Sequence, residues 1–178
     1  MDEHPIIFID ADDDDHNMFK QALSELALPH PVFVFANGQT ALDYLTTTVE
    51  IPFLIISEIS MPGMSGLELR KQIDQDPELR KKCIPFVFMT HPVEEQLVEE
   101  AYELTIQGLF EKKSTYAAWK AQLEAIIAYW SECHHPKRFT RWVWLDKPTS
   151  WMACLPETDH FHLIIHNPSV DVSNFINQ

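Results

Sequence analysis

Short apolar runs alternate along the chain with longer segments in which apolar residues recur at helical spacing. The runs that we expect to form strands are residues 5–10, 31–36, 53–58, 84–90 and 106–111. Helical spacing follows each run, around residues 18–26, 40–47, 65–75, 93–104 and 115–133. This alternation is typical of a parallel sheet that carries helices on both faces.

Five strand and helix pairs within about 130 residues predict an α/β fold. The expected architecture is a flavodoxin-like, doubly wound (βα)5 parallel sheet with strand order 2-1-3-4-5 and a C-terminal extension. In such a sheet the functional crevice lies at the carboxyl ends of the strands.

The pattern changes at residue 134. Beyond it lie three of the five tryptophans and two candidate strands, Arg141 to Leu145 and Phe161 to His166. A segment of this length rarely folds alone. We therefore predict a domain over residues 1–133 and an aromatic-rich extension over 134–178, which packs on the first domain or on a second copy of it.

The composition of the chain narrows the range of functions that we expect. With 46% hydrophobic and 22% charged residues, the chain is expected to fold. The net charge of -14 argues against nucleic-acid binding, which needs clustered Lys and Arg. The three cysteines lack CxxC spacing, the N-terminus lacks a basic start, and no apolar run is long enough to span a membrane. We expect a cytoplasmic protein that binds neither membrane nor nucleic acid.

Polar residues follow four of the predicted strands. Asp10 begins an acidic stretch after the first strand, and Glu58 ends the third. Thr90 ends the fourth strand, and Lys112 follows the fifth. Because the carboxyl ends of parallel strands meet at one edge of a sheet, these side chains are expected to converge.

This spacing, together with the segment Met61-Pro62-Gly63-Met64-Ser65-Gly66, resembles the receiver domains of bacterial two-component response regulators over roughly residues 5 to 132. In that family an aspartate after the third strand accepts a phosphoryl group from phosphohistidine, and Mg²⁺ neutralises charge on the transferred oxygens. The resemblance implies a signalling module in a phosphorelay, not an enzyme, with a histidine kinase or a downstream signalling protein as partner. The resemblance implies that Glu58 is equivalent to the phosphoacceptor and that Asp10, Asp12 and Asp13 form the acidic site. It also implies that Thr90 and Lys112 contact the phosphate, and that Thr90 and Leu109 stand at the switch positions.

Several residues depart from the family pattern. Glu58 replaces the aspartate and is longer by one methylene, a displacement on the order of the ~1 Å that can cost ~100-fold in rate. Ala11 stands at the second acidic position, where a methyl group cannot bind a metal. His91 replaces a small residue and is expected to cover the pocket entrance, and Lys113 replaces a proline. Leu109 replaces an aromatic residue.

Metal binding is accordingly expected to be weak or absent. If Mg²⁺ binds, the implied ligands are Asp10, Glu58 and Ser60, with Asp12 or Asp13 as substitutes for the missing acid. Mg²⁺ demands near-ideal octahedral oxygen geometry, which a shifted backbone seldom reproduces.

Two interpretations of Glu58 stay open: a partial mimic of the phosphorylated aspartate, or a solvated, inert residue that accepts a hydrogen bond from Lys112. The favoured function is an atypical pseudo-receiver that is not phosphorylated in the usual way and acts by binding a protein. That binding would use the surface of the fourth helix, fifth strand and fifth helix, or the aromatic extension. One alternative is an active, Mg²⁺-dependent phosphoacceptor that uses Glu58 or a nearby aspartate. Another is a homodimeric scaffold assembled through the extension.

Overall fold

The computed structural model describes residues 4–134, 141–143 and 153–155. The chain divides into two compact units, residues 1–132 and residues 133–178. In the second unit, β6 (Arg141–Val143) pairs with β7 (Ala153–Leu155) in antiparallel fashion. Strand β6 falls within the predicted strand 141–145, β7 was not predicted, and the predicted strand 161–166 lies outside the described residues.

The first unit is built on a five-stranded parallel sheet. Its strands are β1 (Ile6–Ile9), β2 (Val32–Phe35), β3 (Leu54–Ser57), β4 (Phe86–Thr90) and β5 (Gly108–Glu111), in the order β2-β1-β3-β4-β5. All four strand pairs are parallel. The predicted flavodoxin-like order is therefore confirmed.

The described part of the first unit also contains six helices: α1 (Asp13–Glu25), α2 (Gly38–Thr47), α3 (Gly66–Gln75), α4 (Pro77–Lys81), α5 (Glu95–Glu103) and α6 (Tyr116–Glu132). The short helix α4 was not predicted, since the expected helix of this region ended at residue 75. The Asp76 side chain accepts hydrogen bonds from the backbone N–H groups of Glu78 and Leu79. Proline is well tolerated in the first turn of a helix, so the same dipeptide ends α3 and starts α4.

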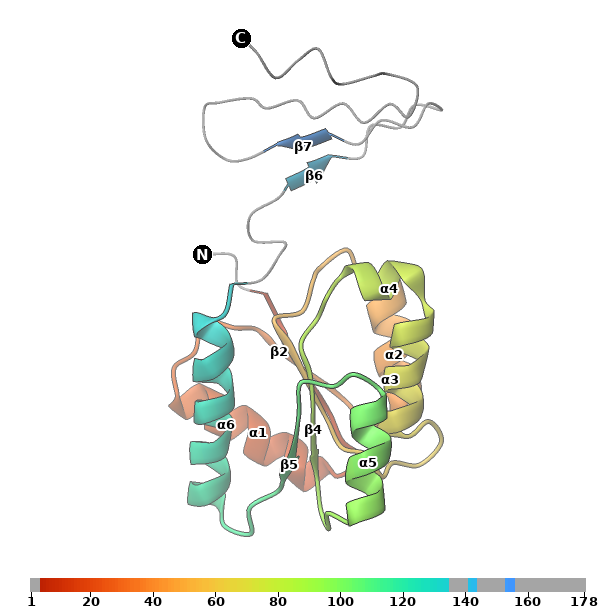
Figure 1. Ribbon diagram of the computed structural model, residues 1–178. Helices are drawn as coiled ribbons and strands as arrows, with labels where there is room; N and C mark the ends of the chain where they lie inside the picture. Colours follow the sequence, from red (N-terminus) through yellow and green to blue (C-terminus); the bar gives the residue numbers. More distant parts are fainter. Residues whose placement is uncertain (1–3, 135–140, 144–152, 156–178) are drawn as a thin grey trace, which may run out of the picture. The chain divides into compact units, whose positions relative to one another are not determined.

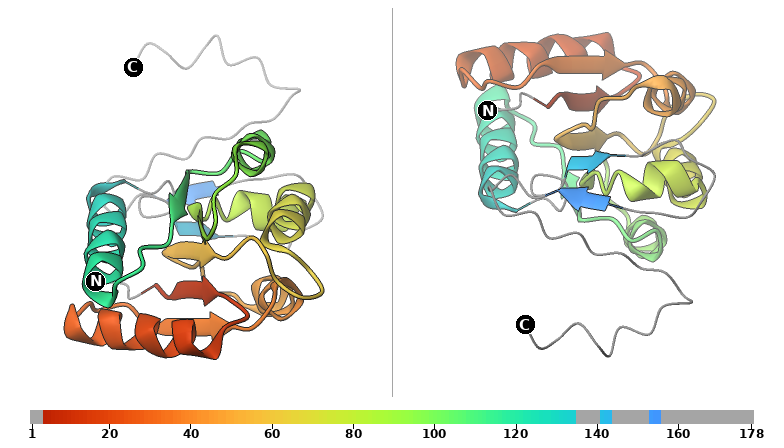
Figure 2. Two further views of the ribbon diagram at one scale, coloured as in Figure 1. Left: turned by 90° about the horizontal axis from the view of Figure 1, so that it is seen from below. Right: turned by 90° about the horizontal axis from the view of Figure 1, so that it is seen from above.

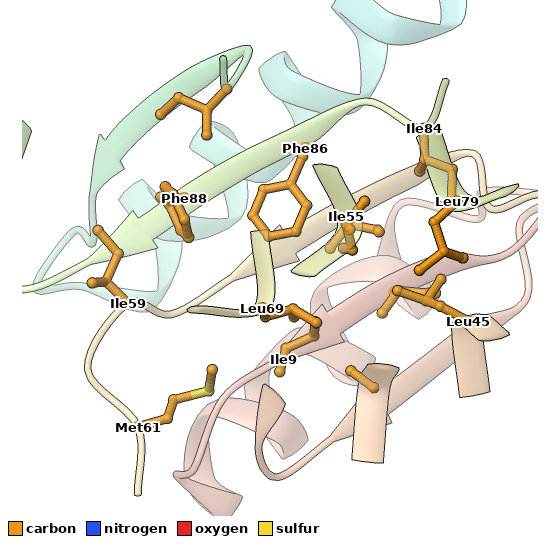
Figure 3. Close-up of a cluster of buried hydrophobic side chains, with 14 of the residues drawn as sticks. Ile9, Leu45, Ile55, Ile59, Met61, Leu69, Leu79, Ile84, Phe86 and Phe88 are labelled. Atoms are coloured by element: carbon orange, nitrogen blue, oxygen red, sulfur yellow. The ribbon is translucent and has the colours of Figure 1, made fainter. Parts of the chain in front are cut away.

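Helices α1 and α6 cover one face of the sheet, and α2, α3 and α5 cover the other (Figures 1 and 2). Every residue of β1, β3 and β4 is buried, as expected for strands covered on both faces. A separate apolar core lies on each face. Figure 3 shows the core beneath α2, α3 and α4, where Leu45, Leu69 and Leu79 pack with Ile9, Ile55 and Phe86.

Backbone hydrogen bonds extend the sheet just beyond the strand ends. The N–H of Glu58 donates to the carbonyl of Ile9 at 2.8 Å, and the N–H of Lys112 donates to the carbonyl of Thr90 at 3.0 Å. Asp10 is held in the same way by the carbonyl of Phe35, at 3.0 Å. The backbone of each polar residue at this edge is thus fixed by the sheet itself.

Candidate functional site

Four of the predicted site residues meet at the carboxyl edge of the sheet. Asp10, Glu58 and Thr90 are 3%, 7% and 1% exposed, and Lys112 lies beside them. They come from the ends of β1, β3, β4 and β5, so each flanks a different strand. An open hollow at this edge is lined by Asp10, Ala11, Asp12, Asp13, Asp15, Glu58, Ser60 and Lys112.

Lys112 binds three carboxylates at once. Its Nζ lies 2.6 Å from Asp10 Oδ2, 2.7 Å from Asp15 Oδ2 and 2.8 Å from Glu58 Oε2. We call Asp10, Asp15, Glu58 and Lys112 the acidic pocket. Because three carboxylates share one ammonium, the pocket carries an excess of negative charge.

Asp15 is the member of this pocket that the sequence analysis missed. It belongs to the acidic stretch that follows the first strand. The signal was helical spacing: Asp15, Phe19 and Ala22 stand at positions i, i+4 and i+7, and the last two are buried in α1. That spacing places Asp15 on the helix face that packs against the sheet.

The carboxylate of Glu58 is hydrogen-bonded on both oxygens. Its Oε1 accepts from the backbone N–H of Ile59 at 2.6 Å, from the N–H of Ser60 at 3.2 Å and from the Thr90 hydroxyl. Its Oε2 accepts from Lys112. Of the two open interpretations, the solvated one included this contact with Lys112, but the Glu58 side chain is buried instead of solvated.

Burial and ion pairing compete in this pocket. Burial raises the pKa of the Asp10 carboxyl more than the hydrogen bonds from Lys112 and from the Asp12 N–H lower it. For Lys112, burial lowers the pKa, but the hydrogen bonds to Asp10, Asp15 and Glu58 together outweigh it and raise the pKa above 10.5. Lys112 is therefore a cation at every physiological pH.

A glycine allows α3 to begin directly against the Glu58 backbone. A Cβ at Gly66 would lie 2.2 Å from the Glu58 carbonyl oxygen, which is far inside van der Waals contact. The Gly66 N–H donates to the Ile59 carbonyl at 2.9 Å. The Ser65 and Glu68 side chains form a capping box that starts α3 at this point. The Gly66 position thus fixes the path of the loop that presents Glu58.

Asp12 and Asp13 line the hollow, but they are not among the carboxylates paired with Lys112. Asp12 caps α1, and its Oδ1 accepts from the Asp14 N–H at 2.8 Å. Asp13 is exposed, with its Oδ1 3.7 Å from the Nδ1 of the buried His16. Both therefore belong to the start of a helix.

The predicted switch residue Leu109 and the predicted entrance residue His91 are not among the residues that line the hollow. Leu109 is half-buried and packs against the core beneath α2 and α3. The His91 side chain is 64% exposed, with its Nδ1 3.5 Å from Glu111 Oε1. The expectation that His91 covers the pocket is wrong, because its ring turns to the carboxylate at the end of the neighbouring strand.

Comparison with known proteins decides the family. The sequence model described as the response regulator receiver domain matches residues 6–124, which is well over half of the chain. The chain belongs to this family. Response regulator Rcp1 of Synechocystis is 24% identical over 132 residues, covering 71% of this chain and 88% of Rcp1. Chemotaxis protein CheY-3 of Vibrio cholerae is 32% identical over 100 residues, covering 52% of this chain and 73% of CheY-3.

Solved receiver structures share the fold. The phosphorylated cyanobacterial phytochrome response regulator RcpA has a TM-score of 0.66 at 23% identity, covering 74% of this chain and 97% of RcpA. The Mn²⁺-bound form of Rcp1 has a TM-score of 0.65 at 22% identity, with the same coverage of both chains. At this identity the likeness is evidence for the fold alone. Within the described part of the chain, no helix combines the length and hydropathy needed to span a membrane.

The carboxylates of this receiver domain surround a lysine ammonium. Lys112 Nζ lies within hydrogen-bonding distance of Asp10, Asp15 and Glu58, so an ammonium already holds the place between the carboxylates. Ala11 adds no oxygen to the hollow that it lines. Among the residues that the structure describes, no group of three or more His, Cys, Asp or Glu side chains is arranged to hold a metal ion.

Proposed function

We propose that this protein is a pseudo-receiver of two-component signalling, one that is not phosphorylated in the usual way and acts by binding another protein. A single observation carries the proposal: Glu58 binds the Thr90 hydroxyl and the Lys112 ammonium through its own carboxylate. The resemblance assigns these two groups to contact with a phosphoryl group. Here the Glu58 carboxylate binds both of these groups.

The hydrogen bonding also disfavours Glu58 as a nucleophile. Its Oε1 accepts from two backbone N–H groups and the Thr90 hydroxyl, and its Oε2 accepts from Lys112. Lone pairs engaged in this way attack phosphorus poorly, and a carboxylate nucleophile must be free to approach in line. Phosphorylation of Glu58 would have to break these bonds before any bond to phosphorus formed.

Of the two interpretations of Glu58, the geometry favours the one in which its charge has a role. Glu58 binds Thr90 and Lys112, the two groups assigned to contact with a phosphoryl group, without any phosphodonor. A carboxylate carries less charge than the ~1.5 to 2 units of a phosphate, so the mimicry is partial. The signalling state of the pocket is then set by the sequence instead of by a kinase.

The proposed partner is a histidine kinase or a downstream signalling protein, and the proposed surface is the one formed by α5, β5 and α6. Helix α5 brings to this surface exposed acidic residues and Tyr102, which is 54% exposed. An exposed aromatic residue within a charged rim is a common feature of protein interfaces. Packing or homodimerisation through residues 134–178 stays a prediction.

Intact mass spectrometry tests the proposal. After incubation with acetyl phosphate and Mg²⁺, the wild-type protein is expected to show no added phosphoryl group. The control is Ala11→Asp/Glu58→Asp in the same chain, which supplies the missing carboxylate and shortens the acceptor by one methylene. That variant is expected to gain a phosphoryl adduct. A stoichiometric adduct on the wild-type protein would instead establish the active phosphoacceptor.

A further inference from the structure

The acidic pocket contains a carboxylate that comes from a helix instead of a strand end. Asp15, in the first turn of α1, places Oδ2 2.7 Å from Lys112 Nζ, and its side chain is only 18% exposed. Ala11, whose side chain is a methyl group, lines the same hollow. The negative charge that residue 11 does not supply is therefore brought in by residue 15.

Every N–H donor of the Lys112 ammonium has a carboxylate partner in this arrangement. A lysine ammonium has three N–H donors and no acceptor. Lys112 Nζ has three carboxylate partners, each within 2.8 Å and each on a different element or strand end. Its side chain is 16% exposed, so these bonds are partly shielded from water. Without Asp15, one of the three donors would lose its charged partner.

The position of the ammonium has a consequence for divalent ions. Mg²⁺ requires oxygen ligands at about 2.0–2.1 Å in near-octahedral geometry. A nitrogen within 2.8 Å of Asp10, Asp15 and Glu58 occupies the space in which such an ion would contact the same oxygens. Its positive charge also repels a second cation at that distance.

We infer that Asp15 is a positioning residue that holds Lys112 as the resident cation of the acidic pocket, in the place where the family resemblance implies a divalent ion. This inference rests on the proposed function, because both describe a pocket closed by its own side chains. It adds that the cation between the carboxylates is an ammonium of the protein itself, and that α1 supplies one of the groups that hold it there.

The first test compares Asp15→Asn with Asp14→Asn. Asp14 is exposed and lies next to Asp15 in the same helix turn, so both substitutions remove one negative charge beside the same helix N-terminus. Of these two aspartates, only Asp15 binds Lys112. The measurement is the ¹⁵N-detected signal of the Lys112 ammonium, whose protons exchange slowly when all three are hydrogen-bonded.

The signal is expected in the wild-type protein and in Asp14→Asn, and it is expected to disappear in Asp15→Asn. Ala11→Asp/Asp15→Asn, which returns a carboxylate to the hollow from its other side, should restore the signal. If Asp15→Asn keeps the signal, or if Asp14→Asn loses it equally, the positioning role is overturned.

The second test measures the melting temperature with and without Mg²⁺ for the wild-type protein, Lys112→Met and Lys113→Met. Wild type and Lys113→Met should not respond. Lys112→Met leaves three carboxylates facing one another, and an ion at about ten times its Kd should raise its Tm by roughly 5 °C.

An equal rise in the wild-type protein, or a folded Lys112→Met that ignores Mg²⁺, would overturn the resident-cation assignment. The acetyl phosphate assay separates this outcome from failure of the proposed function. A phosphoryl adduct on the wild-type protein contradicts the pseudo-receiver regardless of Asp15. If the wild-type protein gains no adduct but the ion and ammonium tests give the overturning results named above, only the inference is contradicted.

Discussion

Replacing Lys112 by methionine removes the cation of the acidic pocket while keeping an unbranched side chain of similar length. In the wild-type protein the ammonium neutralises part of the charge of Asp10, Asp15 and Glu58, whose side chains are 4%, 18% and 9% exposed. The variant leaves these three carboxylates close together with no counter-charge. We therefore expect it to be much less stable at neutral pH.

The size of the loss follows from burial. Removing one partner of a buried ion pair costs about 3–5 kcal/mol, against a total stability of about 5–15 kcal/mol for a domain. The carboxylates can limit the loss by binding protons, since each pKa unit corresponds to about 1.4 kcal/mol. Because the pocket is open to solvent on one side, we expect about 3 kcal/mol for Lys112→Met at neutral pH.

The loss should also depend on pH in a defined direction. Burial already raises the pKa of Asp10, and removal of the ammonium raises it further. A carboxyl whose pKa is higher in the folded state favours folding at low pH and loses this contribution as pH rises through that pKa. The destabilisation of Lys112→Met should accordingly shrink as the pH is lowered.

Urea unfolding followed by the fluorescence of the buried Trp119 measures both effects. The matched control is Lys113→Met, because Lys113 is the exposed neighbour and carries the same charge. A surface substitution of this kind should change stability by no more than about 0.5 kcal/mol. Equal losses for the two variants, or a Lys112→Met loss that does not vary with pH, would refute the ion-pair account of the pocket.

Three further predictions concern the same unit. Since the pKa of Lys112 is raised, its stabilisation should be complete below pH 10.5 and lost as pH rises through the folded-state value, so the stability gap between wild type and Lys112→Met should also narrow in alkali. Gly66→Ala should cost about 3 kcal/mol in urea unfolding, because its Cβ would lie 2.2 Å from the Glu58 carbonyl oxygen; an unchanged midpoint would contradict this packing. Chiefly because Lys120 donates a hydrogen bond to it, the exposed Glu25 has a pKa lowered from 4.5 to about 2. Its contribution is present above 4.5 and lost as pH falls toward 2, and Lys120→Met should return the Glu25 titration, followed by NMR, to its ordinary range.

The strand order and the meeting of Asp10, Glu58, Thr90 and Lys112 followed from the sequence, since both depend on local periodicity and on where strands end. Helix α4 did not, because one dipeptide both stops a helix and starts the next. Nor did the side-chain direction of His91, which depends on a carboxylate presented by the neighbouring strand.

The sequence by itself determined the receiver fold, the edge of the sheet that holds the polar residues, and the substitution of glutamate at position 58. Only the tertiary structure decided how the charges are paired. Lys112 is 102 residues from Asp10 and 97 from Asp15 along the chain, and its choice among several nearby acids depends on side-chain reach and burial. The sequence alone left open whether Glu58 is solvated or engaged; its burial against Thr90 and Lys112 is a property of the packed pocket.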